Sequence, residues 1–135
     1  MLRDAKRLID SFNDPIKEIE LIRKGITPEV IESFLTPHDY VMKDVLQRLH
    51  IAISTYKSKK TSKSLLDPSA SEKLMRLVSI INKAKDIIGE TETKEWLYRN
   101  VASLGNVKPI DLLDTEAGHR LVEQSLNQIK YGIYS

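Results

Sequence analysis

Apolar residues separated by three or four positions run along most of this 135-residue chain, and that spacing places them on one face of an α-helix. The clearest examples are Leu74, Leu77, Val78, Ile81, Ala84 and Ile88 in the middle of the chain, and Val122, Leu126, Ile129 and Ile133 near its end. No segment shows the convincing apolar–polar alternation that is typical of a half-buried strand. The sequence therefore predicts an all-α fold.

Prolines, glycines and capping residues predict where the helices begin and end. A first helix is expected over residues 2–12, and a second from Pro15 to Gly25. Thr27-Pro28 and Thr36-Pro37 each combine a capping hydroxyl with a proline at the first helical position, where no amide hydrogen is needed. Two more helix starts are therefore predicted at these threonines.

The second half of the chain is divided in the same way. The longest helix is predicted to begin at a capping box, Ser69 to Glu72, and to stop at Gly89. A short helix over residues 92–99, a loop over 100–108 and a helical turn over 109–113 precede a last helix that begins at Thr115. Gly118 lies inside that helix, where glycine costs about 1 kcal/mol relative to alanine. A close contact between the last helix and another segment is the expected reason.

Composition favours a folded binding protein over an enzyme. Charged residues make up 30% and hydrophobic residues 41% of the chain, a balance typical of a globular domain. The chain has no cysteine, and its three histidines lack metal-ligand spacing, so we expect no metal site, no cofactor and no catalytic residue. Neither an apolar signal region nor a run of about eighteen apolar residues is present, which favours a cytoplasmic protein.

Three clusters of charged residues do not change that expectation. Acidic residues gather at Glu90, Glu92 and Glu95 and again at Asp111 and Asp114, but negative charge in the first turn of a helix explains both groups. Basic residues gather between residues 45 and 66, which hold five basic side chains and no acidic one. That segment is either a solvated lysine-rich loop or a surface for nucleic acid.

The C-terminal end carries the most specific signal. Chain ends are normally polar, yet the last five residues include Tyr131, Ile133 and Tyr134. Upstream of them, a set of residues resembles the toxin-binding domain shared by the Xre, MbcA and ParS antitoxins: Trp96-Leu97, Asn100, Leu104-Gly105, Pro109, Asp111-Leu112-Leu113, Thr115, Gly118, Val122, Ile129 and Tyr131-Gly132-Ile133-Tyr134. The region from about residue 16 to 89 is similar to the helix-turn-helix-like part of Xre antitoxins.

This resemblance implies a domain plan and a function. It implies an N-terminal extension (residues 1–15), an Xre-like helix-turn-helix bundle (16–67), and a connecting helix with a small helical toxin-binding domain (68–135). It also implies an antitoxin of a type II toxin–antitoxin pair, whose partner is a RES-domain toxin that consumes NAD. In that family the C-terminal end blocks the toxin's active site, and the matching residues here are Tyr131, Gly132, Ile133, Tyr134 and Ser135.

Each of the apolar and aromatic residues of the toxin-binding region belongs either to the chain's own core or to the toxin interface. Ile133 continues the apolar stripe of the last helix, so it belongs either to the chain's own core or to the toxin interface. The same alternatives apply to the two tyrosines, for which we favour the interface. For Trp96, the single tryptophan, we favour the core because a buried indole contributes a large apolar area.

The resemblance also implies a helix-turn-helix, with a scanning helix over residues 39–47 and the turn and recognition helix over 49–57. The DNA-binding residues would be Ser54, Thr55, Tyr56, Lys57, Lys59, Lys60 and Lys63, and operator recognition would require a homodimer. His50 occupies the turn position that favours glycine, and the recognition helix has no arginine or asparagine for bidentate base contacts. The alternatives are therefore a degenerate helix-turn-helix kept as scaffold, a free-standing Xre-type transcriptional regulator, and a helical adaptor with another partner.

Overall fold

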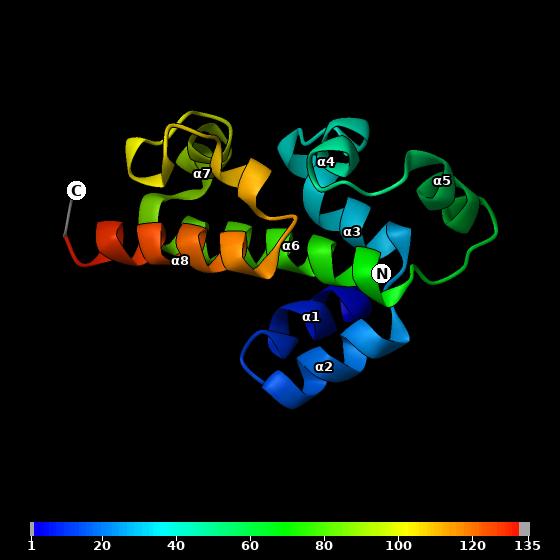
Figure 1. Cartoon of the computed structure of the whole chain (residues 1–135). Helices are drawn as coiled ribbons and strands as arrows, with labels where there is room; N and C mark the ends of the chain where they lie inside the picture. The colour runs from blue at the N-terminus through cyan, green and yellow to red at the C-terminus, as the bar shows by residue number, and fades with distance from the viewer. Residues whose placement is uncertain (1, 133–135) are drawn as a thin grey trace. The chain divides into compact units, whose positions relative to one another are not determined.

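The structure is a computed structural model that describes the backbone of residues 2–132 and the side chains of residues 6–132. Its elements, of which Figure 1 labels the α-helices, are α1 (Leu2–Ser11), α2 (Pro15–Lys24), α3 (Pro28–Leu35), η1 (Thr36–His38), α4 (Met42–Arg48), α5 (Ile53–Thr61), α6 (Pro68–Ile88), α7 (Glu90–Leu97), η2 (Ala102–Leu104), η3 (Pro109–Leu112) and α8 (Glu116–Lys130). Within residues 2–132 the only β pairing is an isolated bridge between Val101 and Val107. The all-α prediction is confirmed.

Contacts along the chain define two compact units, Met1–Met75 and Arg76–Ser135. The long helix α6 begins in the first unit and continues into the second. The boundary predicted from the sequence, between residues 67 and 68, falls at the start of this helix, and the segment of residues 1–15 contains α1.

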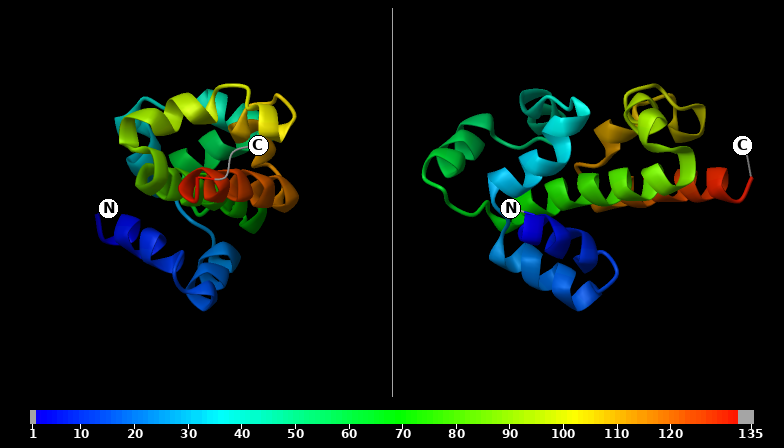
Figure 2. Two further views of the ribbon diagram at one scale, coloured as in Figure 1. Left: turned by 90° about the vertical axis from the view of Figure 1, so that its left-hand side faces the viewer. Right: turned by 180° about the vertical axis from the view of Figure 1, so that it is seen from behind.

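The first unit is built around α3. Helix α1 packs against both α2 and α3, while α5 packs against α3 and α4, and Figure 2 shows α1 and α2 as a hairpin in both views. The fully buried side chains of this unit include Leu8, Ile31, Leu35, Leu46 and Leu49. These residues come from α1, α3 and the region of α4, so they join the hairpin and the helix-turn-helix region into one core.

In the second unit, η2 and η3 pack onto α8, and α7 packs onto η3. Its buried side chains include Trp96, Leu97, Ile110, Leu113, Val122 and Leu126. The preference for Trp96 as a core residue is confirmed, since its side chain is buried. The segment between α7 and α8 is not a plain loop, because residues 102–104 and 109–112 form short 3₁₀ helices.

Most predicted helix starts are confirmed, and two are wrong. Thr27 accepts a hydrogen bond from the amide of Val30, as an N-cap residue does. Thr36 is no N-cap, because the chain continues directly from α3 into a 3₁₀ turn and the Thr36 hydroxyl donates to the carbonyl of Glu32. The proposed capping box at Ser69 is also wrong, since α6 begins at Pro68 and Asp67 accepts from the amide of Ala70.

Candidate functional site

The turn between α4 and α5 has the backbone shape that its sequence position predicts. His50 lies there with φ of +56°, so the position does need the left-handed conformation that favours glycine. The amide of His50 donates to Gln47, and that of Ile51 donates to Leu46 at 2.9 Å. The preceding helix starts at Met42, not at Asp39, because Asp39 has φ of +66° and ends the η1 turn. A helix–turn–helix path is therefore present over residues 42–61.

One proposed DNA contact is wrong. Ser54, Thr55 and Lys57 are exposed on α5, as expected. Tyr56 is only 3% exposed, and its hydroxyl donates to Glu32 at 2.7 Å. The side chain points into the unit because α5 packs on α3 through this residue. Tyr56 is therefore a core residue that holds α5 in place.

Glu32 also binds a second residue of α5. Its other carboxylate oxygen accepts from Lys60 at 2.8 Å, so one α3 side chain holds two positions of α5. Burial and the Glu32 hydrogen bond both raise the pKa of Tyr56, and the hydrogen bond to Glu32 raises the pKa of Lys60. This Glu32 cluster (Glu32, Tyr56 and Lys60) was not foreseen, because no sequence spacing relates α3 to α5.

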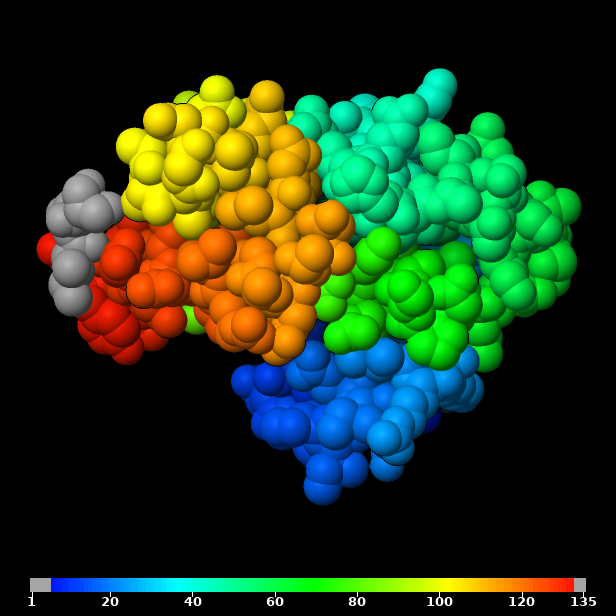
Figure 3. Space-filling view, in the orientation of Figure 1, coloured from blue at the N-terminus to red at the C-terminus, as the bar shows by residue number. Residues whose placement is uncertain are grey.

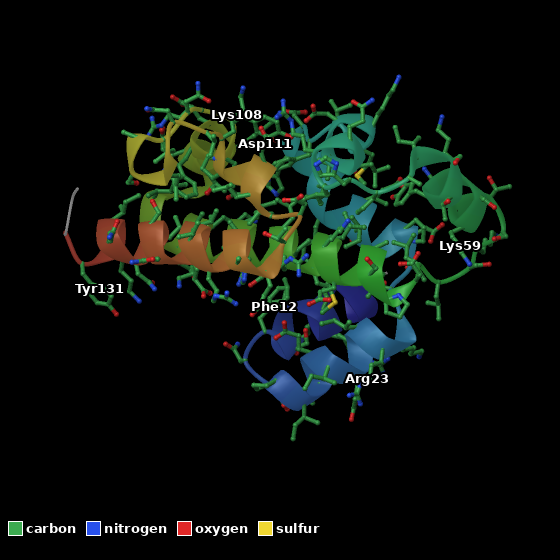
Figure 4. All side chains as sticks on the ribbon, viewed as in Figure 1. Phe12, Arg23, Lys59, Lys108, Asp111 and Tyr131 are labelled. Atoms are coloured by element: carbon green, nitrogen blue, oxygen red, sulfur yellow. The ribbon has the colours of Figure 1, made fainter. Side chains whose placement is uncertain are left out.

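The remaining basic side chains of this region differ in what they contact. Arg48 forms an ion pair with Asp44 at 3.0 Å. Among the residues that the structure describes, Lys57, Lys59 and Lys63 have no acidic partner. Lys59, labelled in Figure 4, lines a small cavity of about 150 Å³ beside the turn, and Lys63 follows the end of α5 with φ of +54°. No carboxylate of the described chain therefore competes with an external partner for these three lysines.

In the second unit, three hydrogen bonds and one close backbone contact fix the N-terminal part of α8 and the turn before it. The Thr115 hydroxyl accepts from the amide of Gly118 at 3.0 Å, as an N-cap. The Arg76 guanidinium donates to the carbonyls of Leu113 and Asp114, both at 3.1 Å. A Cβ at Gly118 would overlap the carbonyl oxygen of Leu112. The predicted close contact at Gly118 is confirmed, and its partner is the backbone of η3.

His119 is a half-buried group on α8 that the sequence placed in no role. Its Nε2 is buried and makes no hydrogen bond to the residues that the structure describes. Burial lowers the pKa of His119, and the nearby Arg76 and Lys83 act in the same direction, whereas Glu123 and Glu116 oppose it. The imidazole therefore stays neutral to lower pH than an exposed histidine would.

A cleft of about 470 Å³ opens beside α8. Its walls come from α7, the η2 turn and the last two turns of α8, with Ile88 at the end of α6. The lining residues are Ile88, Glu92, Trp96, Arg99, Val101, Ala102, Ser103, Ser125, Gln128 and Ile129. Half of these residues are polar or charged and half are apolar, so the cleft could bury a partner's side chain and also offer it hydrogen-bond partners. The cleft depends on tertiary packing between α7 and α8, which no local pattern in the sequence reveals.

The end of α8 presents an aromatic ring to solvent. Tyr131 is 69% exposed, and its amide donates to the carbonyls of Asn127 and Ile129. Figure 4 shows its ring projecting away from the helix, and the Lys130 ammonium lies 5.5 Å from the ring centre. Gly132 follows with φ of +69°. Three other proposed toxin contacts, Ile133, Tyr134 and Ser135, lie outside the described residues.

Metal-binding clusters and membrane-spanning helices are absent from the same part of the chain. Residues 2–132 contain no group of three or more histidines or carboxylates arranged to hold a metal ion. No helix among them is long and apolar enough to cross a membrane. The surfaces described above are therefore the candidates for function.

Comparison with known proteins bears directly on these surfaces. Residues 83–132 match the antitoxin Xre/MbcA/ParS C-terminal toxin-binding domain. This stretch contains α7, η2, η3 and α8, and with them the cleft and Tyr131. The matched residues thus include all the features of the second unit that are suited to binding a partner protein.

Three curated relatives align over most of the chain. The Prs ADP-ribosylating antitoxin of Sphingobium sp. (strain YBL2) is 28% identical over 131 residues, which cover 90% of this chain and 82% of that protein. Antitoxin Xre of Photorhabdus laumondii is 25% identical, and the alignment covers 85% of this chain and 79% of that protein. Antitoxin Xre of Yersinia enterocolitica is 24% identical, and the alignment covers 87% of this chain and 80% of that protein. Residues 83–132 thus carry a toxin-binding domain of the Xre/MbcA/ParS type, in a chain that is similar over most of its length to three antitoxins.

Proposed function

We propose that this antitoxin silences a RES-domain, NAD-consuming toxin in the cytoplasm by occluding the toxin's active site with its own C-terminal end. The observation that carries the proposal is the exposed ring of Tyr131 at the end of an ordered helix. The occluding segment is Tyr131, Gly132, Ile133, Tyr134 and Ser135. Neutralisation by this route is steric and needs no catalytic residue in the antitoxin.

The chemistry of the end of α8 supports this mechanism. Tyrosine combines a rigid apolar ring with a hydroxyl, and such rings dominate the energetics of protein interfaces. Helix α8 is held by Thr115, Arg76 and the Gly118 approach, so the ring projects from a fixed support. A preorganised anchor loses little conformational entropy on binding.

Co-expression with a RES-domain toxin from an adjacent reading frame tests the proposal. The full chain should restore the cellular NAD level that the toxin alone depletes, and a chain lacking residues 131–135 should not. Circular dichroism and thermal melting of the truncated chain are the control, because the truncation leaves the Thr115 cap and the Val122 and Leu126 contacts in place. Full neutralisation by a folded, truncated chain would refute occlusion by the C-terminal end.

We further propose that the protein represses its own operon as a homodimer through α4 and α5. The exposed Ser54, Thr55 and Lys57 and the unpaired Lys59 and Lys63 support this, since short polar groups suit base edges and lysines suit phosphates. Binding of a promoter fragment in a gel-shift or fluorescence-anisotropy titration tests it. If the chain binds its promoter but fails to neutralise any neighbouring toxin, it is a free-standing regulator instead.

A further inference from the structure

The cleft beside α8 carries no net charge, although half of its lining residues are polar or charged. Glu92 and Arg99 are its two charged lining residues, and their charges cancel. A surface for nucleic acid instead needs an excess of basic groups, because each bound phosphate is negative. The charge of the cleft therefore favours a protein as the occupant.

The interior of the cleft is suited to apolar side chains. Trp96 and Ser125 are its most buried lining residues, at 3% and 5% exposure, and Ile88, Val101 and Ile129 are half-buried beside them. An apolar side chain inserted here covers the parts of these aliphatic residues that remain in contact with water, which favours binding. The cleft therefore suits a partner that presents an apolar projection.

The cleft is continuous with the end of α8 that carries Tyr131. Gln128 lines the cleft and lies three positions before Tyr131, so the two side chains are neighbours on one face of the helix. Their separation along the helix axis is only about 4.5 Å. A protein that receives the Tyr131 ring therefore also reaches the mouth of the cleft.

The matched domain indicates which protein this is. Every lining residue of the cleft falls within residues 83–132, the range that matches the toxin-binding domain. One wall of the cleft is the η2 turn, which packs on α8, and in Figure 3 the yellow segment around residue 100 borders the orange and red α8. The toxin is therefore the occupant that the position of the cleft favours.

We propose that this cleft is a second contact for the toxin, separate from the C-terminal end, and that the toxin inserts an apolar side chain between Trp96, Val101 and Ile129. The inference rests on the proposed binding of a toxin but not on occlusion by residues 131–135. The C-terminal end blocks the active site, and the cleft fixes the orientation of α8 on the toxin. Because ordered elements form the cleft, binding there orders no additional loop.

A substitution that fills the cleft provides the first test. Ala102 lines the cleft and is exposed, so Ala102→Trp occupies space in the cleft without displacing a core side chain. It should weaken binding to a catalytically inactive RES-domain toxin at least tenfold, measured by isothermal titration calorimetry. The matched control is Ala117→Trp, at an exposed position in the first turn of α8 and about 21 Å from Tyr131 along the axis, which should bind like the wild type. An unchanged affinity of an Ala102→Trp chain with wild-type circular dichroism would overturn the proposal.

The single tryptophan provides a second test that needs no substitution. Trp96 is the chain's only tryptophan and lines the cleft, so labelling with fluorotryptophan gives one fluorine NMR resonance that reports on it. Saturating unlabelled toxin should shift this resonance in the full chain. A resonance that stays unchanged at saturation would overturn the proposal.

The same resonance distinguishes other occupants in the absence of toxin. A shift as large as the toxin-induced one on deletion of residues 131–135 would assign the cleft to the chain's own end. A shift of that size with increasing protein concentration would assign the cleft to a second copy. Either result would overturn the assignment to the toxin.

The failure of this inference is distinguishable from the failure of the proposed occlusion. A chain that ends at Lys130 and still neutralises the toxin would refute occlusion and leave the cleft contact standing. An Ala102→Trp chain that binds the toxin normally would refute the cleft contact and leave occlusion standing. A wild-type chain that binds no RES-domain toxin would refute both.

Discussion

Tyr131 is the described residue that bears most directly on neutralisation. Tyr131→Ala should weaken binding to the toxin by roughly 2 kcal/mol, or about thirtyfold, if the ring fills a pocket as an interface hot spot does. Isothermal titration calorimetry against a catalytically inactive toxin measures the change. Leu121→Ala, another exposed apolar residue of α8, is the control and should bind normally. Equal affinities for the wild type and Tyr131→Ala would remove this ring from the mechanism.

The lowered pKa of His119 predicts how the stability of the protein depends on pH. Burial lowers its pKa in the folded state below the ordinary value of 6.5, so the unfolded chain binds a proton at a higher pH than the folded chain does. The contribution of His119 to stability is therefore fully present above about pH 6.5, declines as the pH falls below that value, and levels off below the folded-state pKa.

A neutral replacement tests this contribution. His119→Gln should flatten the decline in the free energy of unfolding between about pH 6.5 and 5, measured by urea denaturation at each pH. Gln124→Ala changes an exposed neutral residue of the same helix and should leave the decline as it is. An unchanged pH profile in His119→Gln would show that the group titrates alike in both states.

At the scale of single residues, the sequence predicted which small polar and basic side chains of α5 are exposed, but not that its tyrosine side chain points inward. Ser54, Thr55 and Lys57 are exposed as expected, but the neighbouring Tyr56 faces inward. The decisive contact is Glu32, which lies 24 residues earlier and accepts from the Tyr56 hydroxyl. Tyrosine suits a DNA-facing surface and a hydrogen-bonded core equally well, so only tertiary contacts decide between them.

At the scale of elements, capping residues and apolar spacing predicted most of the helices but not the tertiary contacts between them. Thr27 and Thr115 cap α3 and α8 as expected, because an N-cap is decided within four residues. Thr36 was misassigned because a threonine–proline pair also fits a 3₁₀ turn that continues a helix. The cleft beside α8 could not be predicted, since its walls come from segments more than twenty residues apart.

At Gly118, the backbone of η3 leaves no room for a larger residue on α8. Gly118→Ala should raise the intrinsic helix propensity of α8 and still destabilise the protein by about 1–3 kcal/mol, because its methyl group would overlap the backbone of η3. Thermal melting measures the change. Gln124→Ala, at an exposed position of the same helix, should leave the melting temperature almost unchanged. A more stable Gly118→Ala variant would mean that η3 moves aside at little cost.

At the scale of the whole molecule, the two proposed activities reside in different units of one chain. The helix-turn-helix path lies within residues 42–61 and the toxin-binding domain within 83–132. Substitutions at the surface of one unit should therefore leave the activity of the other intact. Lys57→Ala/Lys59→Ala/Lys63→Ala should lose repression of a promoter–reporter fusion and still neutralise the toxin, while truncation after residue 130 should do the reverse.

The ionic-strength dependence of promoter binding decides which lysines carry the first activity. Each lost phosphate contact should reduce the slope of log affinity against log salt concentration by roughly 0.9, so the triple lysine variant should flatten it by up to about 2.7. Lys60→Ala should flatten it less than any one of the three, because Glu32 already neutralises Lys60 at 2.8 Å. Fluorescence anisotropy between low and moderate salt measures the slopes of the wild type, the triple variant, Lys60→Ala and the three single lysine variants. An unchanged slope in the triple variant would make these lysines part of a solvated surface, and the helix-turn-helix would then serve as scaffold only.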